Sequence, residues 1–338
     1  MKKHLILLFI CIVLTSCRSS QNKKHTEDVV LNPLTYTASI TSAELKEMLY
    51  IYASDEYEGR KTGEVGQKKA IEFIKNHYKA NRIPSPIAED DYFQEIPASY
   101  FGRNIKESEN VIAYIKGSEK PDEVIIISAH LDHIGISNDG SINNGADDDG
   151  SGTVALLEIA EAFKIAKEAG HGPKRSIAFL HVTGEEIGLY GSRYYTDKDP
   201  IFPLENTVAN LNIDMIGRVD KKHETTGKNY LYLIGSDKLS KELHDISEKV
   251  NESFFNLELD YTYNRNNDPN RFYYRSDHYN FAKNNIPVIF YFNGTHADYH
   301  KPSDTPDKIN YAFLETRTRL IFHTAWELAN RNDRIIVD

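Results

Sequence analysis

Acidic and histidine side chains follow three apolar stretches of this sequence, each at the point where the apolar run stops. The stretch EVIIISAHLDHIG carries His130 and Asp132, and RSIAFLHVTGEE ends in Glu185 and Glu186. A third stretch, TVANLNID, ends at Asp214. Burying such groups without a partner costs several kcal/mol each, so they need a common partner. Because carboxylate and imidazole groups are metal ligands, the pattern indicates a metal site.

Three consecutive aspartates, Asp147 to Asp149, stand before an apolar helical pattern in GADDDGSGTVALLEIA. Adjacent carboxylates repel one another unless a cation or a helix N-terminus stabilises them. The glycines around them let the backbone pass close to a bound ion. A late stretch, YHKPSDTPDKI, adds His300. Each of these short motifs alone is common in surface loops and helix caps, but their coincidence favours a metal centre.

The elements that must position these groups alternate between strand and helix patterns. Apolar runs predict strands at 109–117, 123–130, 175–183, 207–217, 229–235 and 287–292. Helical periodicity and end signals predict helices at 41–54, 63–81, 151–170, 186–195 and 240–254, followed by a long C-terminal helix. Thr41 and Glu44 form a capping box at the first helix, and Gly170 is a stop signal for the third.

This alternation predicts an α/β fold of three layers, with a mostly parallel mixed central sheet and helices on both faces. Ligands of such sheets bind at the carboxyl ends of the strands. The acids and histidines of the first three stretches stand at those ends, so we expect them to lie close together.

The first residues have the composition of an export signal. MKKHLILLFICIVLTSC begins with lysines, continues with an apolar run too short to cross a membrane and ends in small residues. LTSC resembles the lipobox of bacterial lipoproteins, which implies cleavage before Cys17 and acylation of that cysteine. We therefore expect a signal peptide at 1–16, a lipid-anchored tether at 17–40 and a catalytic domain at 41–338. The expected location is the bacterial cell envelope, facing the periplasm or on the outer membrane.

Composition and missing motifs exclude several classes of function. The formal net charge of the 338-residue chain is −10, and it becomes −12 (38 basic, 50 acidic residues) when Lys2 and Lys3 leave with the signal. Such a chain lacks the basic surface that nucleic acid requires. The sequence contains no G-x-S-x-G nucleophile elbow, no P-loop and no H-E-x-x-H, since HETTG at His223 lacks the second histidine.

Six segments, in their order along the chain, resemble the co-catalytic two-zinc aminopeptidase family typified by secreted bacterial leucine aminopeptidase. They are SAHLDHIG, GADDDGSGTVALLEIA, VTGEEIGLYGS, LNIDMIG, RSDHYNFA and HKPSDTPDKI. The resemblance implies a fold of the zinc-exopeptidase type, two zinc ions per chain and peptide substrates. The implied activity is hydrolysis of N-terminal residues from peptides.

The resemblance also implies a set of metal ligands. His130 and Asp214 correspond to the ligands of one zinc ion, Glu186 and His300 to those of the other, and Asp148 to the bridge between the two ions. Each ion then has nitrogen and oxygen ligands and an open position for water, as catalytic zinc requires.

Three further residues correspond to catalytic positions of the family. Asp132 corresponds to the acid that orients His130 without binding metal. Glu185 corresponds to the general base, which takes a proton from water activated by the two ions and passes it to the leaving amine. Tyr273, three residues before Ser276, corresponds to the donor that stabilises the oxyanion.

Some of these assignments have rivals close by in the sequence. Tyr274 competes with Tyr273 as oxyanion donor, and His296 competes with His300 as the late ligand. His133, next to Asp132, is expected at the rim of the pocket.

Three other functions compete with the aminopeptidase interpretation. Glutaminyl cyclases resemble the same family, keep a comparable carboxylate set and use one zinc ion. Carboxypeptidases of the same fold bind the substrate's free carboxylate with arginines, and Arg265, Arg271 and Arg275 stand in YNRNNDPNRFYYRSD. A lipid-anchored binding module with a decayed site is the third, but all five expected ligands and Glu185 are present. The sequence does not indicate an oligomeric state.

Overall fold

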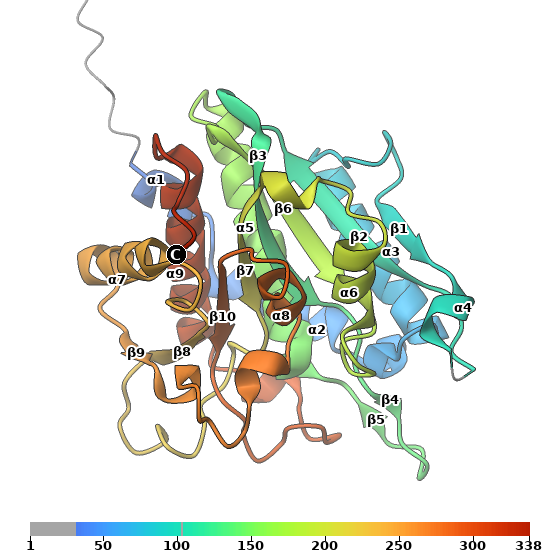
Figure 1. Ribbon diagram of the computed structural model, residues 1–338. Coiled ribbons are helices and arrows are strands. Elements are labelled where there is room, and N and C mark those ends of the chain that lie inside the picture. Colours follow the sequence, from blue (N-terminus) through green and yellow to red (C-terminus); the bar gives the residue numbers. More distant parts are fainter. Residues whose placement is uncertain (1–31, 103) are drawn as a thin grey trace, which may run out of the picture. The chain divides into compact units, whose positions relative to one another are not determined.

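The computed structural model describes residues 32–102 and 104–338 (Figure 1). The expected signal peptide, the acylated Cys17 and most of the tether lie outside the described residues. Residues 33–338 form one unit. Within the described residues no helix combines the length and apolar composition that crossing a membrane would require.

An eight-stranded mixed sheet forms the centre of this unit, in the order β1-β2-β6-β3-β7-β10-β8-β9. The neighbouring strands β6, β3, β7 and β10 are parallel. On one side β2 pairs antiparallel with β6 and β1 antiparallel with β2; on the other side β8 pairs antiparallel with β10 and β9 parallel with β8. The strands are β1 (Phe93–Ile96), β2 (Ser108–Ile115), β3 (Lys120–His130), β6 (Arg175–Val182), β7 (Thr207–Ile213), β8 (Tyr230–Ile234), β9 (Glu258–Asp260) and β10 (Val288–Phe292).

Helices cover both faces of the sheet (Figure 1). On one face α5 (Gly152–Glu168) and α9 (Tyr311–Asn330) contact the central strands, and four helices pack on them. These four are α1 (Leu34–Thr37), α2 (Ser42–Tyr52), α3 (Val65–Ala80) and α7 (Lys241–Phe254), and α3 also contacts β2 directly. On the other face lie α6 (Tyr190–Asp197) and α8 (His278–Ala282), which contact each other. The predicted three-layer α/β fold is confirmed.

The central strands are apolar on both faces because helices cover both. Ile125, Ile126 and Ile127 of β3 are fully buried, and burial of each such side chain contributes roughly 1.5–3 kcal/mol. On the side of α6 and α8, Ile126 lies in a cluster with Tyr195 and Phe281 from those helices. This packing holds the ends of the central strands in a fixed position.

Local end signals define the helices that flank the site. The Thr41 hydroxyl accepts a hydrogen bond from the Glu44 backbone N–H (3.2 Å), which confirms the predicted cap of α2. Helix α5 ends at Glu168, and Gly170 follows with a φ of 83°, as its stop signal predicts. The helix expected at 186–195 begins at Tyr190, because Gly188 and Leu189 have positive φ angles of 123° and 58°. The loop before α6 is therefore free to carry functional side chains.

Two small elements stand outside the main sheet. Helix α4 (Ala98–Phe101) follows β1, and β4 (Gly135–Ile136) pairs with β5 (Ile142–Asn143) in a hairpin after β3. The sequence patterns did not predict either element, since both are short.

The chain is packed from Pro33, which corrects the expected start of the domain at residue 41. The Tyr36 ring stacks on Trp326 of α9, with ring centroids 5.6 Å apart, and Ile40 is fully buried. These contacts involve residues far away in the sequence, so the polar composition of the segment did not reveal them. Residues 33–40 belong to the domain and not to a tether.

Candidate metal centre

Three neighbouring parallel strands deliver the predicted ligands to one edge of the sheet. His130 is the last residue of β3, Asp214 follows β7 directly, and Glu185 and Glu186 lie in the loop after β6. Because β6, β3 and β7 are adjacent and parallel, their carboxyl ends meet. Asp148 reaches the same place from the segment before α5.

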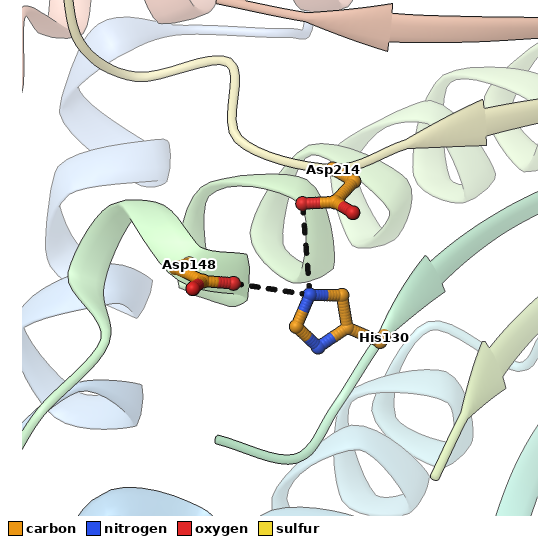
Figure 2. A group of neighbouring side chains, drawn as sticks. All are labelled: His130, Asp148 and Asp214. Atoms are coloured by element: carbon orange, nitrogen blue, oxygen red, sulfur yellow. Dashed lines mark ion pairs between the residues drawn. The ribbon is translucent and has the colours of Figure 1, made fainter. Parts of the chain in front are cut away.

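The first group of potential ligands is His130, Asp148 and Asp214 (Figure 2). His130 Nε2 lies 3.1 Å from Asp148 Oδ1 and 3.6 Å from Asp214 Oδ1. On the other side of the ring, Nδ1 lies 3.0 Å from the main-chain oxygen of Asp132. A proton on Nδ1 satisfies that oxygen and leaves the lone pair of Nε2 directed at the carboxylates, as metal binding requires.

The second group surrounds the other oxygen of Asp148. His300 Nε2 lies 3.1 Å from Asp148 Oδ2 and 3.1 Å from Glu186 Oε2. His133 Nδ1 lies 2.7 Å from Glu186 Oε1 and 3.7 Å from Asp148 Oδ2. Asp148 thus stands between two sets of imidazole groups. The structure brings all five sequence-predicted ligands together and adds His133, which the sequence placed at the rim.

The three consecutive aspartates have three different partners. Asp149 accepts hydrogen bonds from the N–H groups of His130 (3.1 Å) and Met215 (3.1 Å), so it ties the end of β3 to the end of β7. Asp147 accepts from the Gly217 N–H (2.7 Å). The structure pairs His296, the competing late histidine, with Asp147 (3.2 Å). Only the middle aspartate of the three faces both potential metal positions.

A chain of buried hydrogen bonds holds Asp214 through its Oδ2, the oxygen that does not face His130. The Ser276 hydroxyl donates to Asp214 Oδ2 (2.6 Å) and accepts from the Asn212 side chain (2.9 Å). The Ser128 hydroxyl donates to Asn212 Oδ1 (2.7 Å) and accepts from Asn210 (2.9 Å). All of these side chains are buried, so Asp214 has little freedom to turn away from His130.

The residues of the cluster fit zinc. Burial alone would raise the pKa of Asp148, but His130, His133 and His300 bring it well below its usual range, so this carboxylate is ionised. Asp148 Oδ2 and Glu186 Oε1 are buried and have no hydrogen-bond partner among the described residues. Buried, ionised oxygens without partners are costly unless a cation binds them. With imidazole nitrogen beside carboxylate oxygen, the donor set is one that zinc prefers.

Glu185 lies beside the ligands without belonging to either group. Its backbone N–H donates to Asp132 Oδ1 (3.1 Å), and Asp132 Oδ2 accepts from the Thr62 hydroxyl (2.7 Å). Burial raises the pKa of Glu185 well above its usual range, and Asp214 adds to this effect, whereas His130 opposes it. The Asp132 carboxylate, 3.9 Å from His130 Nδ1, therefore contacts both the histidine and the loop that carries Glu185.

A small cavity of about 30 Å³ opens at the cluster. Asp148, Glu185 and Asp214 are part of its lining. The rest of the lining is mostly apolar or aromatic: Met215, Phe272, Arg275, Phe290, Phe292, Thr295 and Tyr299.

The cavity contains a different tyrosine from the one that the sequence suggested. Tyr299 lines the cavity and stacks on His300, with ring centroids 3.9 Å apart. Tyr273 and its rival Tyr274 do not line it; both line a neighbouring polar pocket, where Lys238 lies over the Tyr273 ring. The position of Tyr299 directly before His300 was a signal that the sequence analysis did not use.

A mostly parallel α/β sheet whose central strands end in a buried cluster of carboxylate and imidazole groups is the arrangement of a metal-dependent enzyme. The chain belongs to peptidase family M28, which it matches over residues 110–325. This range begins in β2 and ends within α9, so it includes every residue of the cluster.

Known proteins similar to this chain include three kinds of enzyme. A probable glutamate carboxypeptidase of Arabidopsis thaliana, LAMP1, is 35% identical over 117 residues, which cover 34% of this chain and 16% of that protein. The zinc aminopeptidase BSAP from Bacillus subtilis has a TM-score of 0.66 at 16% identity, covering 88% of this chain and 98% of that chain. Glutaminyl cyclase from Bacteroides thetaiotaomicron has a TM-score of 0.62 at 16% identity, covering 85% and 98%.

These likenesses differ in what they establish. The matched segments span between 14% and 37% of the length of the curated relatives. The solved structures, at 16% identity, show the shared fold. The fold alone serves both peptide hydrolysis and glutaminyl cyclisation, so the reaction must be argued from the residues at the site.

Proposed function

We propose that this chain is a zinc-dependent exopeptidase that removes N-terminal residues from peptides, with two zinc ions at the cluster and Glu185 as general base. The position of Asp148 is the observation that carries this proposal. Its Oδ1 lies 3.1 Å from His130 Nε2, and its Oδ2 lies 3.1 Å from His300 Nε2. A carboxylate held between two imidazole groups is suited to bridge two cations.

The reaction needs a group that moves a proton. Zinc held by these residues would polarise the scissile carbonyl and lower the pKa of water at the site. Glu185 lines the same cavity as Asp148 and Asp214, so its carboxylate accepts a proton from the attacking water. As the carbon–nitrogen bond breaks, Glu185 passes that proton to the leaving amine. Asp132 keeps the carboxylate in place through the Glu185 backbone.

The tetrahedral oxyanion needs a hydrogen-bond donor, and Tyr299 is our candidate in place of Tyr273. Its ring stacks on His300 and lines the cavity at the cluster, whereas Tyr273 lines the neighbouring pocket. A phenolic hydroxyl at this point is suited to stabilise negative charge on the substrate oxygen.

The lining of the cavity supports action at an N-terminus. Glu185, the lining carboxylate outside both ligand groups, suits a substrate ammonium group, and the lining residues Phe272, Phe290 and Phe292 suit an apolar side chain.

Arg275 supports a second candidate, a carboxypeptidase. It lines the same cavity, and its guanidinium group lies 5.0 Å from the centre of the Phe272 ring. Arginine binds carboxylates through two parallel hydrogen bonds, which suits the free C-terminus of a peptide. Arg265 and Arg271 do not line the cavity but the neighbouring polar pocket, so only one of the three arginines is at the site.

One assay separates these functions. We would count zinc in the purified protein and offer it three substrates: leucine anilide, an N-blocked dipeptide and a peptide with an N-terminal glutamine. Two zinc ions with anilide cleavage support the aminopeptidase. Cleavage of the blocked dipeptide alone supports the carboxypeptidase, and one zinc ion with cyclised glutamine supports a cyclase. Zinc-free protein without turnover contradicts the proposal.

We also propose that the chain is exported and anchored to the bacterial cell envelope through acylated Cys17. The motif LTSC supports this proposal. Intact mass measurement on protein isolated from membranes checks it, because a lipoprotein starts at Cys17 and carries added acyl mass. A mature chain that starts elsewhere, or that carries no lipid, contradicts it.

A further inference from the structure

His133 is buried at the cluster with both ring nitrogens unused. Within the described part of the chain neither Nδ1 nor Nε2 has a hydrogen-bond partner, and the residue is 1% exposed. Nδ1 lies 2.7 Å from Glu186 Oε1, but the two atoms are not aligned as a hydrogen bond. Leaving a buried polar group without a partner is unfavourable, so the position needs another explanation.

Other buried atoms without hydrogen-bond partners lie close to His133 Nδ1. Glu186 Oε1 and Asp148 Oδ2 are also buried without partners, and they lie 2.7 Å and 3.7 Å from His133 Nδ1. Two nitrogen or oxygen ligands on one tetrahedral zinc ion stand roughly 3.3 Å apart, because each zinc–ligand bond is about 2.0 Å long. One cation between these three atoms would satisfy all of them.

The surrounding backbone holds the His133 ring in this place. Gly145 passes so close that a Cβ there would lie 2.5 Å from His133 Cδ2. Arg60, itself fully buried, donates to the main-chain oxygens of Leu131, Asn144 and Gly145. The His133 N–H donates to the main-chain oxygen of Arg60 (3.2 Å). The loops on both sides of the imidazole are thus joined to one guanidinium group.

We propose that His133 is a metal ligand of the second position, in addition to His300. This inference rests on the proposed two-ion site. The second position then has four protein ligands, Asp148, Glu186, His133 and His300, while the first has three, His130, Asp148 and Asp214. A zinc ion with four protein ligands is closed, whereas one with three keeps a place for water.

An ion pair between a protonated His133 and Glu186 is the ordinary alternative. It requires a charged imidazole in a buried place, and burying a charge that is not fully hydrogen-bonded costs more than burying a neutral ring. A neutral His133 that donates its lone pair to a cation avoids that charge.

Zinc K-edge absorption spectroscopy of the fully loaded protein tests the proposal, because it counts imidazole ligands directly. If His133 binds zinc, three imidazoles serve two ions; if it does not, two imidazoles serve two ions. His133→Ala should remove one imidazole from the spectrum and lower the affinity for the second ion by more than about 100-fold, beyond the loss typical of residues outside the ligand set. His244→Ala, a histidine remote from the cluster, is the matched control.

A second measurement distinguishes an effect of the substitution on folding from an effect on zinc binding. Thermal unfolding of each variant without zinc shows whether the substitution damages the fold itself, and His133→Gln keeps the volume if the alanine variant does not fold. Both variants should match the parent without zinc and gain less stability when zinc is added. Two zinc ions with only two imidazoles would overturn the role of His133 but leave the proposed function intact. Protein that binds no zinc would overturn both.

Discussion

The two metal positions of the cluster are built in different ways. The first is formed by the ends of β3 and β7, and its Asp214 is fixed by the buried hydroxyl of Ser276. The second depends on loops: Glu186 precedes α6, and His300 is 38% exposed with a φ of 55°. Rigid elements hold ligands in place with less freedom than loops do. We therefore expect the first position to depend on buried neighbours and the second on the loops that carry its ligands.

Asp148 is the residue that the two positions share, so its removal should have the largest effect. Asp148→Asn weakens both ions together, because each oxygen of the carboxylate faces a different position. We expect loss of both zinc ions in a metal titration and loss of turnover with them. Asp245→Asn, an exposed substitution on α7, is the control. Loss of one ion with full retention of the other would show that Asp148 does not bridge.

Glu185→Gln should have the next largest effect, on turnover and not on metal content. The amide keeps the size of the side chain but cannot accept the proton of the attacking water, and general acid–base catalysis contributes roughly 100- to 10,000-fold. We expect kcat to fall by this order while two zinc ions remain bound. The exposed Glu252→Gln is the matched control. Near-normal kcat would remove Glu185 from the mechanism.

Ser276→Ala should separate the zinc affinities of the two positions, because Ser276 contacts a ligand of the first position only. The substitution removes the donor to Asp214 and leaves Glu186, His133 and His300 unchanged. Loss of such a positioning residue lowers metal affinity by about 10- to 100-fold. We expect this loss for one of the two ions in a competition titration with a chelator. Equal weakening of both ions, or of neither, would contradict a separate first position.

Ser118→Ala is the control for this experiment. Ser118 precedes β3, at the end of the strand opposite to His130, and its hydroxyl donates to the Pro173 main-chain oxygen. The substitution removes a serine hydroxyl that does not contact the cluster, so the affinities for both zinc ions should match those of the parent.

The difference between the positions also explains what could be predicted from the sequence. The strands β3, β6 and β7 are mostly apolar, and the acidic and histidine residues at or shortly after the end of each are visible without a structure. The fold and the convergence of the ligands follow from that pattern. The antiparallel pairing of β2 and β8 does not, because apolar runs carry no information on strand direction.

Features that depend on contacts between distant residues were not predictable in the same way. The hydrogen bond from Ser276 to Asp214 joins residues 62 positions apart, and the packing of Tyr36 on Trp326 joins opposite ends of the domain sequence. The sequence placed His133 at the rim of the pocket, but the side chain is buried. A histidine after a strand can turn toward solvent or inward, and here the hydrogen bonds of Arg60 to the surrounding backbone hold it inward.

A second group of carboxylates shows why imidazole matters for the interpretation of the first. Glu158 of α5 is buried near Glu44, Glu161 and Glu315, and no histidine is among the groups that shift its pKa. Burial and these neighbours raise the pKa of Glu158 to about 8. Protonation, and not a cation, therefore relieves the repulsion within this group. Acidic clusters alone do not indicate a metal site, and the strand-end cluster differs by its three histidines.

Glu158→Gln tests this contrast through the pH dependence of stability. The pKa is raised in the folded state, so the folded protein binds more protons than the unfolded chain between the ordinary pKa and about 8. Stability that is present at pH 5 is therefore lost as the pH rises to 8, by up to about 1.4 kcal/mol per pH unit. Glutamine carries no charge, so the variant should be more stable than the parent at pH 8 and similar to it at pH 5. Denaturant unfolding at both pH values with saturating zinc measures the difference, and the exposed Glu47→Gln should show none. An equal effect at the two pH values would mean that Glu158 is ionised in the fold and has a cationic partner, which would remove the contrast between the two clusters.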